Sequence, residues 1–179
     1  MVENINLLLP YLVLFSHVVW VVLFFALIFR NSWGMILSVS LGKHAILLAC
    51  LTALVAIIGS LFYSEIMGFE PCSLCWWQRV FLYPLAIIFW VALWKKAESA
   101  FLYALPFALA SALLAAYQSY ISLGGTSILP CTALGGACSK IYVMAFGYIT
   151  IPMMSLTVSL YILLLAWADK IYGKNHPHS

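Results

Sequence analysis

Long continuous apolar runs constrain the fold of this chain more than any other feature of its sequence. There are five, and they cover residues 7–29, 45–67, 77–94, 101–123 and 143–168. A helix rises about 1.5 Å per residue and the hydrocarbon core of a bilayer is about 30 Å thick, so about 20 residues cross it once. Strands are disfavoured because the runs do not alternate and because backbone groups in lipid must be satisfied within the segment. Each run therefore predicts one transmembrane helix.

The composition agrees with an integral membrane protein. Of 179 residues, 66% are hydrophobic and 7% are charged, whereas a soluble domain carries about 25% charged residues. The net charge of +3 comes from few residues and gives no reason to expect a nucleic-acid partner. The gaps between the runs are short and contain no repeat or low-complexity linker. We therefore expect residues 1–179 to form a single all-α domain, a polytopic helical bundle in contact with lipid.

The first run, residues 7–29, has some features of a signal peptide. However, no basic segment precedes it, it is longer than a typical signal core, and no small-residue cleavage pattern follows it. We therefore expect it to remain as a helix. Its His17 is a lone polar residue in an apolar run, and we interpret it as bonded to a neighbouring helix or facing the outer interface.

The basic residues predict the orientation of the bundle. With five crossings, six lysines and arginines fall on one face and two on the other. The six are Arg30, Lys43, Lys95, Lys96, Lys170 and Lys174, and the two are Arg79 and Lys140. The positive-inside bias places the face with six in the cytoplasm. The loops after the second and the fourth helix would then lie outside.

Four of the five cysteines fall in these two outer loops. Cys72 and Cys75 form a Cys-x-x-Cys pair in the first, and Cys131 and Cys138 lie in the second with six residues between them. Disulfides persist outside the cytoplasm, so both pairs can be oxidised there. Cys50 is alone within the second helix, and we interpret it as a small buried residue. A Cys-x-x-Cys pair alone can close a disulfide, hold a metal or have neither role, but two pairs on one face suggest exchange between them.

Two residues beside the first pair indicate its chemistry. Because Pro71 suits a helix start, we expect the third helix to begin around residues 72–76, with its free N–H groups and positive end favouring a thiolate. Arg79 follows Cys75 by one helical turn on the same face and can place a fixed charge near that sulfur or near a polar ligand. An arginine alone at this position would be interpreted as an interfacial anchor. Next to the cysteine pair we favour the functional role.

Other polar and aromatic residues near the outer face have simpler interpretations. Trp76 and Trp77 lie where an aromatic belt is expected, although they could also form part of a pocket wall for a planar ring. Gln118, toward the outer end of the fourth helix, must face protein, water or a ligand, and an interhelical hydrogen bond is the commoner outcome.

Taken together, these residues resemble a known family. Cys72-Ser73-Leu74-Cys75 followed by Arg79, with a second cysteine pair in the next outer loop, is similar to DsbB, the membrane thiol:quinone oxidoreductase. The short second loop and residues 146–156 more closely resemble its BdbC branch. The resemblance covers residues 45–168 and implies a four-helix core. Residues 7–29 would then be an additional N-terminal helix whose role the resemblance does not explain.

The resemblance implies an electron relay in the bacterial cytoplasmic membrane. A reduced extracytoplasmic thioredoxin-like, DsbA-like partner would attack the second-loop disulfide, with Cys131 forming the mixed disulfide and Cys138 as its pair mate. Electrons would pass to Cys72 and Cys75 through a transient bond between Cys72 and Cys138. Cys75 would face a quinone, either ubiquinone or menaquinone, and form a charge-transfer complex with it, assisted by Arg79.

Three other interpretations remain open. A vitamin K epoxide reductase-like quinone reductase shares the bundle and the two cysteine pairs, but in that family the loop pair precedes the Cys-x-x-Cys. Four thiolates could form a zinc or copper site, yet no histidine or carboxylate cluster accompanies them, so we predict no metal. The third is a non-enzymatic membrane protein stapled by two disulfides. The sequence lacks GxGxxG and P-loop motifs, so an electron carrier dissolved in the bilayer suits it best.

Overall fold

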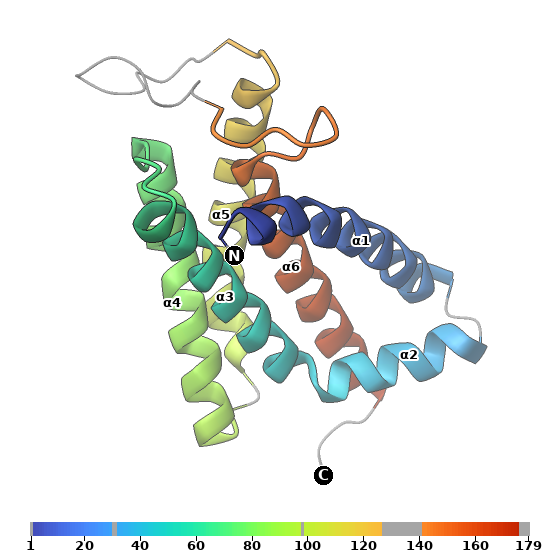
Figure 1. Ribbon diagram of the computed structural model, residues 1–179. Coiled ribbons are helices and arrows are strands. Elements are labelled where there is room, and N and C mark those ends of the chain that lie inside the picture. Colours follow the sequence, from blue (N-terminus) through green and yellow to red (C-terminus); the bar gives the residue numbers. More distant parts are fainter. Residues whose placement is uncertain (1, 30–31, 98, 127–140, 176–179) are drawn as a thin grey trace.

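The computed structural model describes residues 2–29, 32–97, 99–126 and 141–175. These ranges fold mainly into helices (Figure 1), which are α1 (Val2–Phe29), α2 (Ser32–Lys43), α3 (Ala45–Leu61), η1 (Phe62–Ile66), α4 (Ser73–Lys95), α5 (Ala100–Ser122) and α6 (Ile151–Asn175). The element η1 is a π-helical turn that continues α3. Within the described ranges, strand-like pairing is limited to one bridge between Ala145 and Ile149. The predicted all-α fold is confirmed.

Within the described residues, five helical segments are long and apolar enough to cross a membrane. They are Leu8–Phe29, Ala45–Ile66, Ser73–Lys95, Ala100–Ser122 and Ile151–Gly173. Each overlaps one of the runs identified in the sequence. The chain is therefore a polytopic helical membrane protein, as predicted.

Two features of the helices differ from the prediction. The last helix begins at Ile151 rather than at residue 143, because the chain first makes a turn in which Phe146 and Gly147 have φ angles of 53° and 76°. A positive φ is incompatible with a right-handed helix, so this turn delays the helix start. The short helix α2 is an addition, and its serines, glycines and lysine make it too polar to read as a spanning run.

Four helices, α3 to α6, pack around a common core (Figure 1). Of these, α4 lies between α3 and α5, while α6 contacts α3 and α5 on their other side. The helix α2 packs along α6, and α1 folds back against α2 and α6. The N-terminal helix thus joins the bundle at its side.

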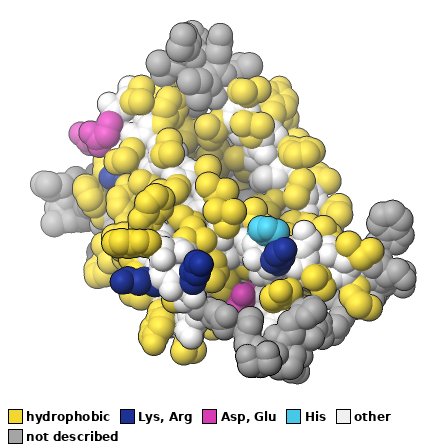
Figure 2. Space-filling view, turned by 90° about the horizontal axis from the view of Figure 1, so that it is seen from below, with side chains coloured by type: hydrophobic (Ala, Val, Ile, Leu, Met, Phe, Trp, Pro, Cys, Tyr) yellow, Lys and Arg dark blue, Asp and Glu magenta, His cyan; other side chains and the backbone are white. Residues whose placement is uncertain are grey.

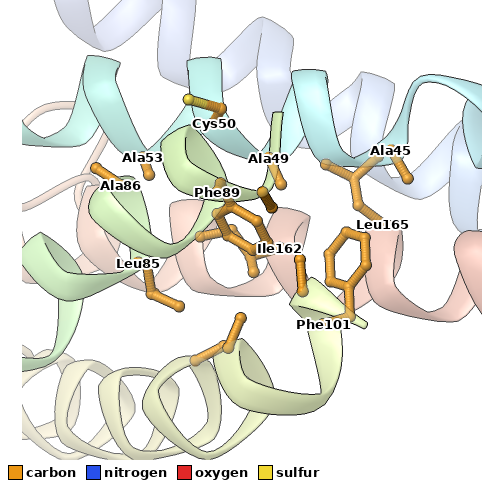
Figure 3. Packing of buried hydrophobic residues seen from close by; sticks show 14 of the residues in the cluster. Ala45, Ala49, Cys50, Ala53, Leu85, Ala86, Phe89, Phe101, Ile162 and Leu165 are labelled. Carbon is orange, nitrogen blue, oxygen red and sulfur yellow. The ribbon is translucent and has the colours of Figure 1, made fainter. Parts of the chain in front are cut away.

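Small side chains dominate the contacts inside this group of four. Figure 3 shows Ala49 and Ala53 of α3 in one cluster with Phe89 of α4 and Ile162 of α6. In membranes, small residues allow helix backbones to approach closely and so increase van der Waals contact. Cys50 belongs to the same cluster and is only 2% exposed, which confirms its interpretation as a small buried residue.

The two ends of the bundle carry different groups. The turn η1, the start of α4 and the end of α5 lie at one end, which we call the cysteine end because it holds Cys72 and Cys75. The opposite end, which we call the lysine end, is formed by the last turns of α2, α4 and α6 and carries Lys43, Lys95, Lys96 and Lys170. Figure 2 views the molecule from below and shows dark blue basic side chains scattered over a largely hydrophobic surface.

Candidate active site

The Cys72 and Cys75 pair lies at the start of α4. Cys72 is the N-cap residue, with an extended backbone (φ −71°, ψ 168°), and its Sγ accepts a hydrogen bond from the Cys75 N–H over 3.3 Å. Pro71 directly precedes this cap, and the prediction that a helix begins around residues 72–76 is confirmed. The two sulfur atoms are 2.7 Å apart. A disulfide, with a bond of about 2.05 Å, therefore needs only a small movement of the two side chains.

The start of α4 also suits sulfur chemistry electrostatically. The first N–H groups of a helix lack intrahelical acceptors and carry the positive end of its dipole. Cys72 is buried and Cys75 half-buried at this point. The helix start stabilises a negatively charged sulfur, whereas burial disfavours it. The thiolate is the form that attacks disulfides.

Two buried glutamines on neighbouring helices form a chain of hydrogen bonds that ends at the pair. Gln118 of α5 donates from Nε2 to the Sγ atoms of Cys72 and Cys75 over 3.2 and 3.3 Å. Gln78 of α4 donates from Nε2 to the Gln118 Oε1 over 2.6 Å. Because Gln78 binds the amide oxygen, the amide nitrogen of Gln118 is directed at the sulfurs. The predicted interhelical hydrogen bond of Gln118 is confirmed, and its partners include the cysteine pair itself.

Arg79 lies one turn beyond Cys75 and bridges α4 to α3. Its Nε donates to the Ser60 Oγ over 2.9 Å and its Nη2 donates to the Ser60 carbonyl over 3.2 Å. The guanidinium carbon lies 5.1 Å from the centroid of the Trp76 ring, within range of a cation–π interaction. Among the described residues, no carboxylate pairs with Arg79. An arginine has five N–H donors, so the remaining ones can serve a ligand.

A largely apolar cavity of about 560 Å³ opens beside these groups. Cys72, Cys75, Gln118 and Arg79 all contribute to its wall, together with side chains from α1, α3 and α6. Its volume falls within the range of about 300–1,000 Å³ that is usual for small-molecule sites. Apolar walls with a few polar groups are also typical of such sites. The cavity can therefore accept an apolar molecule with a polar head.

The N-terminal helix forms part of this wall. Leu9, Leu12, Val13 and Ser16 of α1 line the cavity. His17 fixes α1 to α6, because its Nε2 lies 2.8 Å from the Thr157 Oγ1. The hydroxyl of Tyr148 lies 3.5 Å from the other ring nitrogen. The predicted bond from His17 to a neighbouring helix is confirmed.

The structure thus brings Cys72, Cys75 and Arg79 together around one cavity. The other predicted site residues, Cys131 and Cys138, lie outside the described residues. In the part of the chain that is described, no group of three or more His, Cys, Asp or Glu could hold a metal ion.

Gln78 and Ser60 were not identified from the sequence. Each is a polar residue near the cysteine end of an apolar helix, and burial of a polar group in a membrane requires a partner. That signal was sufficient to single them out for attention. It does not indicate which residue each one contacts.

Comparison with known proteins gives a consistent result. The family model described as "Disulfide bond formation protein DsbB" matches residues 42–168. The chain is 36% identical over 129 residues to "Probable disulfide formation protein C 2" from Bacillus anthracis, covering 72% of this chain and 92% of the relative. It is 39% identical over 114 residues to "Disulfide bond formation protein C" from Bacillus subtilis strain 168, covering 63% and 82%.

A relative outside Bacillus is similar to the same degree. "Probable disulfide formation protein" from Metapseudomonas resinovorans is 37% identical over 124 residues, which cover 68% of this chain and 86% of the relative. No solved structure matches the chain. The helices α1 and most of α2 precede the segment matched by the family model.

Proposed function

Because the chain belongs to the DsbB family of disulfide bond formation proteins, we propose that it is a thiol:quinone oxidoreductase of the bacterial cytoplasmic membrane. It reoxidises an extracytoplasmic thioredoxin-like, DsbA-like disulfide donor and passes the electrons to a membrane quinone. The observation that supports this proposal is the largely apolar cavity that Cys75, Gln118 and Arg79 all line. The family match favours this function over that of a vitamin K epoxide reductase-like protein.

The residues around the cavity fit a quinone. Such a molecule combines an apolar tail and ring with carbonyl oxygens that accept hydrogen bonds. The apolar wall of the cavity suits the tail and the ring. Arg79 has N–H donors that Ser60 does not use, and these suit a carbonyl oxygen. When bound, a quinone would take up the two electrons and two protons that leave Cys72 and Cys75 as their disulfide forms.

The protein's own groups prepare the cysteine pair for this step. The positive end of α4 and the amide of Gln118 stabilise negative charge on sulfur. Arg79, held by Ser60, binds and orients the head group beside Cys75. Side chains of α1 contribute apolar wall to the same cavity.

The second cysteine pair connects this site to the aqueous partner. A thiolate of the reduced partner attacks the disulfide between Cys131 and Cys138 at Cys131, which releases Cys138 as a thiolate. Cys138 then attacks the Cys72–Cys75 disulfide at Cys72, and completion of the exchange leaves that pair reduced. Each exchange forms one S–S bond and breaks one, so only the last step needs an external electron acceptor.

The proposed orientation places both pairs on the extracytoplasmic face. The lysines Lys43, Lys95, Lys96 and Lys170 lie at the end of the bundle opposite Cys72 and Cys75. Lysine and arginine are enriched in cytoplasmic loops. The cysteine end then faces the compartment where disulfides persist.

A reconstituted assay tests this function. Purified protein in lipid vesicles receives a reduced thioredoxin-like donor together with ubiquinone or menaquinone. We expect the loss of donor thiols to require both the protein and the quinone, with one quinone reduced per disulfide formed. Oxidation at the same rate without quinone, or no oxidation with either quinone, would contradict the proposal.

A further inference from the structure

The cavity at the cysteine pair is elongated along α3. Its wall on this helix is a stripe of residues at helical spacing, which are Leu48, Leu51, Thr52, Val55, Ala56, Gly59 and Ser60. At a rise of about 1.5 Å per residue, the stripe from Leu48 to Ser60 covers about 18 Å of helix. This length is more than half of a bilayer core of about 30 Å. The cavity therefore extends from the cysteine end well into the membrane.

The two ends of this stripe differ in polarity. At Ser60 the stripe meets Arg79, which lines the same cavity. Deeper in the membrane the stripe presents mainly leucine and valine side chains. The hydroxyl of Thr52 also lies there, but it donates to the Leu48 carbonyl over 2.7 Å and is thus satisfied by its own helix. A molecule with a polar head at Arg79 and a long apolar tail matches this order.

Open space continues past the polar end of the stripe. Gly59 lines the cavity directly before Ser60, and a Cβ atom at Gly59 would lie more than 4 Å from every other described helix. No described helix therefore packs closely against the stripe at the level where a head group would continue into its tail.

The N-terminal helix supplies a second part of the apolar wall. It lines the cavity with Leu9, Leu12, Val13 and Ser16, most of which are three or four positions apart and so share one face. Two contacts with α6 hold that face in place. The Nε2 atom of His17 lies 2.8 Å from the Thr157 Oγ1, and the Tyr161 hydroxyl donates to the Ser16 carbonyl. The rotation of α1 relative to the cavity is thereby fixed.

We propose that the part of the cavity lined by α1 and α3 holds the isoprenoid tail of the quinone, and that α1 makes the site selective for long-tailed quinones. The inference rests on the proposed function. Since α1 precedes the segment 42–168 matched by the family model, its wall adds to what that segment provides. Lipid chains are as apolar as this wall, so the wall favours the tail through close packing. A side chain that takes the same space should therefore exclude the tail.

Equilibrium binding to the oxidised protein in lipid vesicles tests this inference without turnover. When both cysteine pairs are disulfides, the protein has no electrons to give. Two ubiquinones with the same ring, one with a single isoprenoid unit and one with four, are titrated, and each Kd is followed by quenching of tryptophan fluorescence. Concentrations are expressed per lipid, so that the different partitioning of the tails into the bilayer cancels. We expect the wild type to bind the long-tailed quinone more tightly.

Val13→Phe adds bulk to the α1 wall and should act on the tail alone. Because atoms forced into occupied space are costly, we expect the Kd of the long-tailed quinone to rise about fivefold or more, and that of the short-tailed one to stay within about twofold. Val18→Phe is the matched control on the same helix, since Val18 is exposed and does not line the cavity, and both Kd values should be unchanged.

Thr52→Phe repeats the test on the α3 wall without altering α1. We expect the same selective loss of the long-tailed quinone. The unfolding temperature without quinone shows for each variant that the bundle is intact.

The possible results separate this inference from the proposed function. Equal binding of the two quinones by the wild type, or unchanged binding in folded Val13→Phe and Thr52→Phe, would overturn the tail site and leave the proposed function standing. An equal rise of both Kd values in these variants would place the ring rather than the tail beside α1, and would also overturn it. If the wild type neither binds nor reduces any quinone, the proposed function fails and this inference fails with it.

Discussion

The side-chain amide of Gln118 donates a hydrogen bond to the sulfur of Cys75 over 3.3 Å, although 43 positions separate the two residues in the chain. This contact joins the end of α5 to the first turn of α4. The amide cannot rotate freely, since its oxygen accepts from Gln78 over 2.6 Å. Gln118 thus holds a donor against the cysteine pair and favours a negatively charged sulfur.

Replacement of Gln118 by leucine should slow the chemistry of this pair. A hydrogen bond to a charged group contributes about 1.5–3 kcal/mol, so we expect alkylation of the reduced protein at neutral pH to slow about tenfold or more. The measurement is the rate of reaction with a small neutral alkylating reagent, followed at Cys75 by mass spectrometry.

The Gln118→Leu variant also leaves the amide of Gln78 without its partner. We expect this to cost about 1–3 kcal/mol of stability, which Gln78→Leu in the same chain should partly restore. Ser119→Ala is the matched control, because Ser119 is the adjacent buried residue and its hydroxyl has no partner among the residues that the structure describes. Alkylation as fast in Gln118→Leu as in this control would show that the amide does not stabilise the sulfur.

Arg79→Ala should weaken the use of quinone while leaving the bundle folded. The arginine has no carboxylate partner among the described residues, so its removal leaves no unpaired charge behind. We expect the apparent KM for quinone to rise about tenfold or more, since charge-assisted hydrogen bonds contribute about 1.5–3 kcal/mol. Steady-state kinetics with varied quinone measure this change.

Two further variants serve as comparisons for Arg79→Ala. Arg79→Lys retains the charge but not the paired donation to Ser60, so we expect an intermediate KM. Lys95→Ala, at the other end of α4, should not change it. A quinone KM unaffected by Arg79→Ala would assign this residue to lipid anchoring alone.

Much of the fold was predictable because membrane insertion depends on properties of single segments. Length and continuous hydrophobicity identified all five spans, and Pro71 indicated where α4 begins. Burial of a polar group in lipid requires a partner, so the interhelical bonds of His17 and Gln118 were also predictable in kind.

The identity of the partners was not predictable, for a physical reason. A helix that is apolar on all sides does not encode its rotation about its own axis. The contact of Gln118 with Cys75, and that of Arg79 with Ser60, both depend on that rotation. The helix α2 escaped prediction because it lies against α6 without being long or apolar enough to span. The contribution of α1 to the cavity wall was therefore not predictable either, because α2 connects α1 to the bundle.

Each of the four cysteines of the two proposed pairs should be indispensable for turnover. Cys72→Ala, Cys75→Ala, Cys131→Ala and Cys138→Ala each remove one partner of a disulfide, so we expect donor oxidation to fall to the uncatalysed background. Loss of donor thiols over time measures this. A fully active Cys75→Ala variant would refute the mechanism.

Cys50→Ala provides the control for these four substitutions. Cys50 is buried in the core cluster, and the loss of one sulfur atom there should cost about 1 kcal/mol of stability with little change in turnover. Inactivation by Cys50→Ala with the fold intact would assign that cysteine a role that its surroundings do not indicate.

Labelling of engineered cysteines tests the orientation of the bundle. In a variant with all five native cysteines replaced by alanine, Thr126→Cys places a thiol beyond α5 at the cysteine end, and Ser99→Cys places one before α5 at the lysine end. Both positions are exposed. Because the lysine end should face the cytoplasm, a membrane-impermeant maleimide added to intact cells should label Thr126→Cys, and Ser99→Cys only after lysis. The reverse pattern would place the cysteine pair on the cytoplasmic side, where disulfides are rare, and would reject the proposed relay.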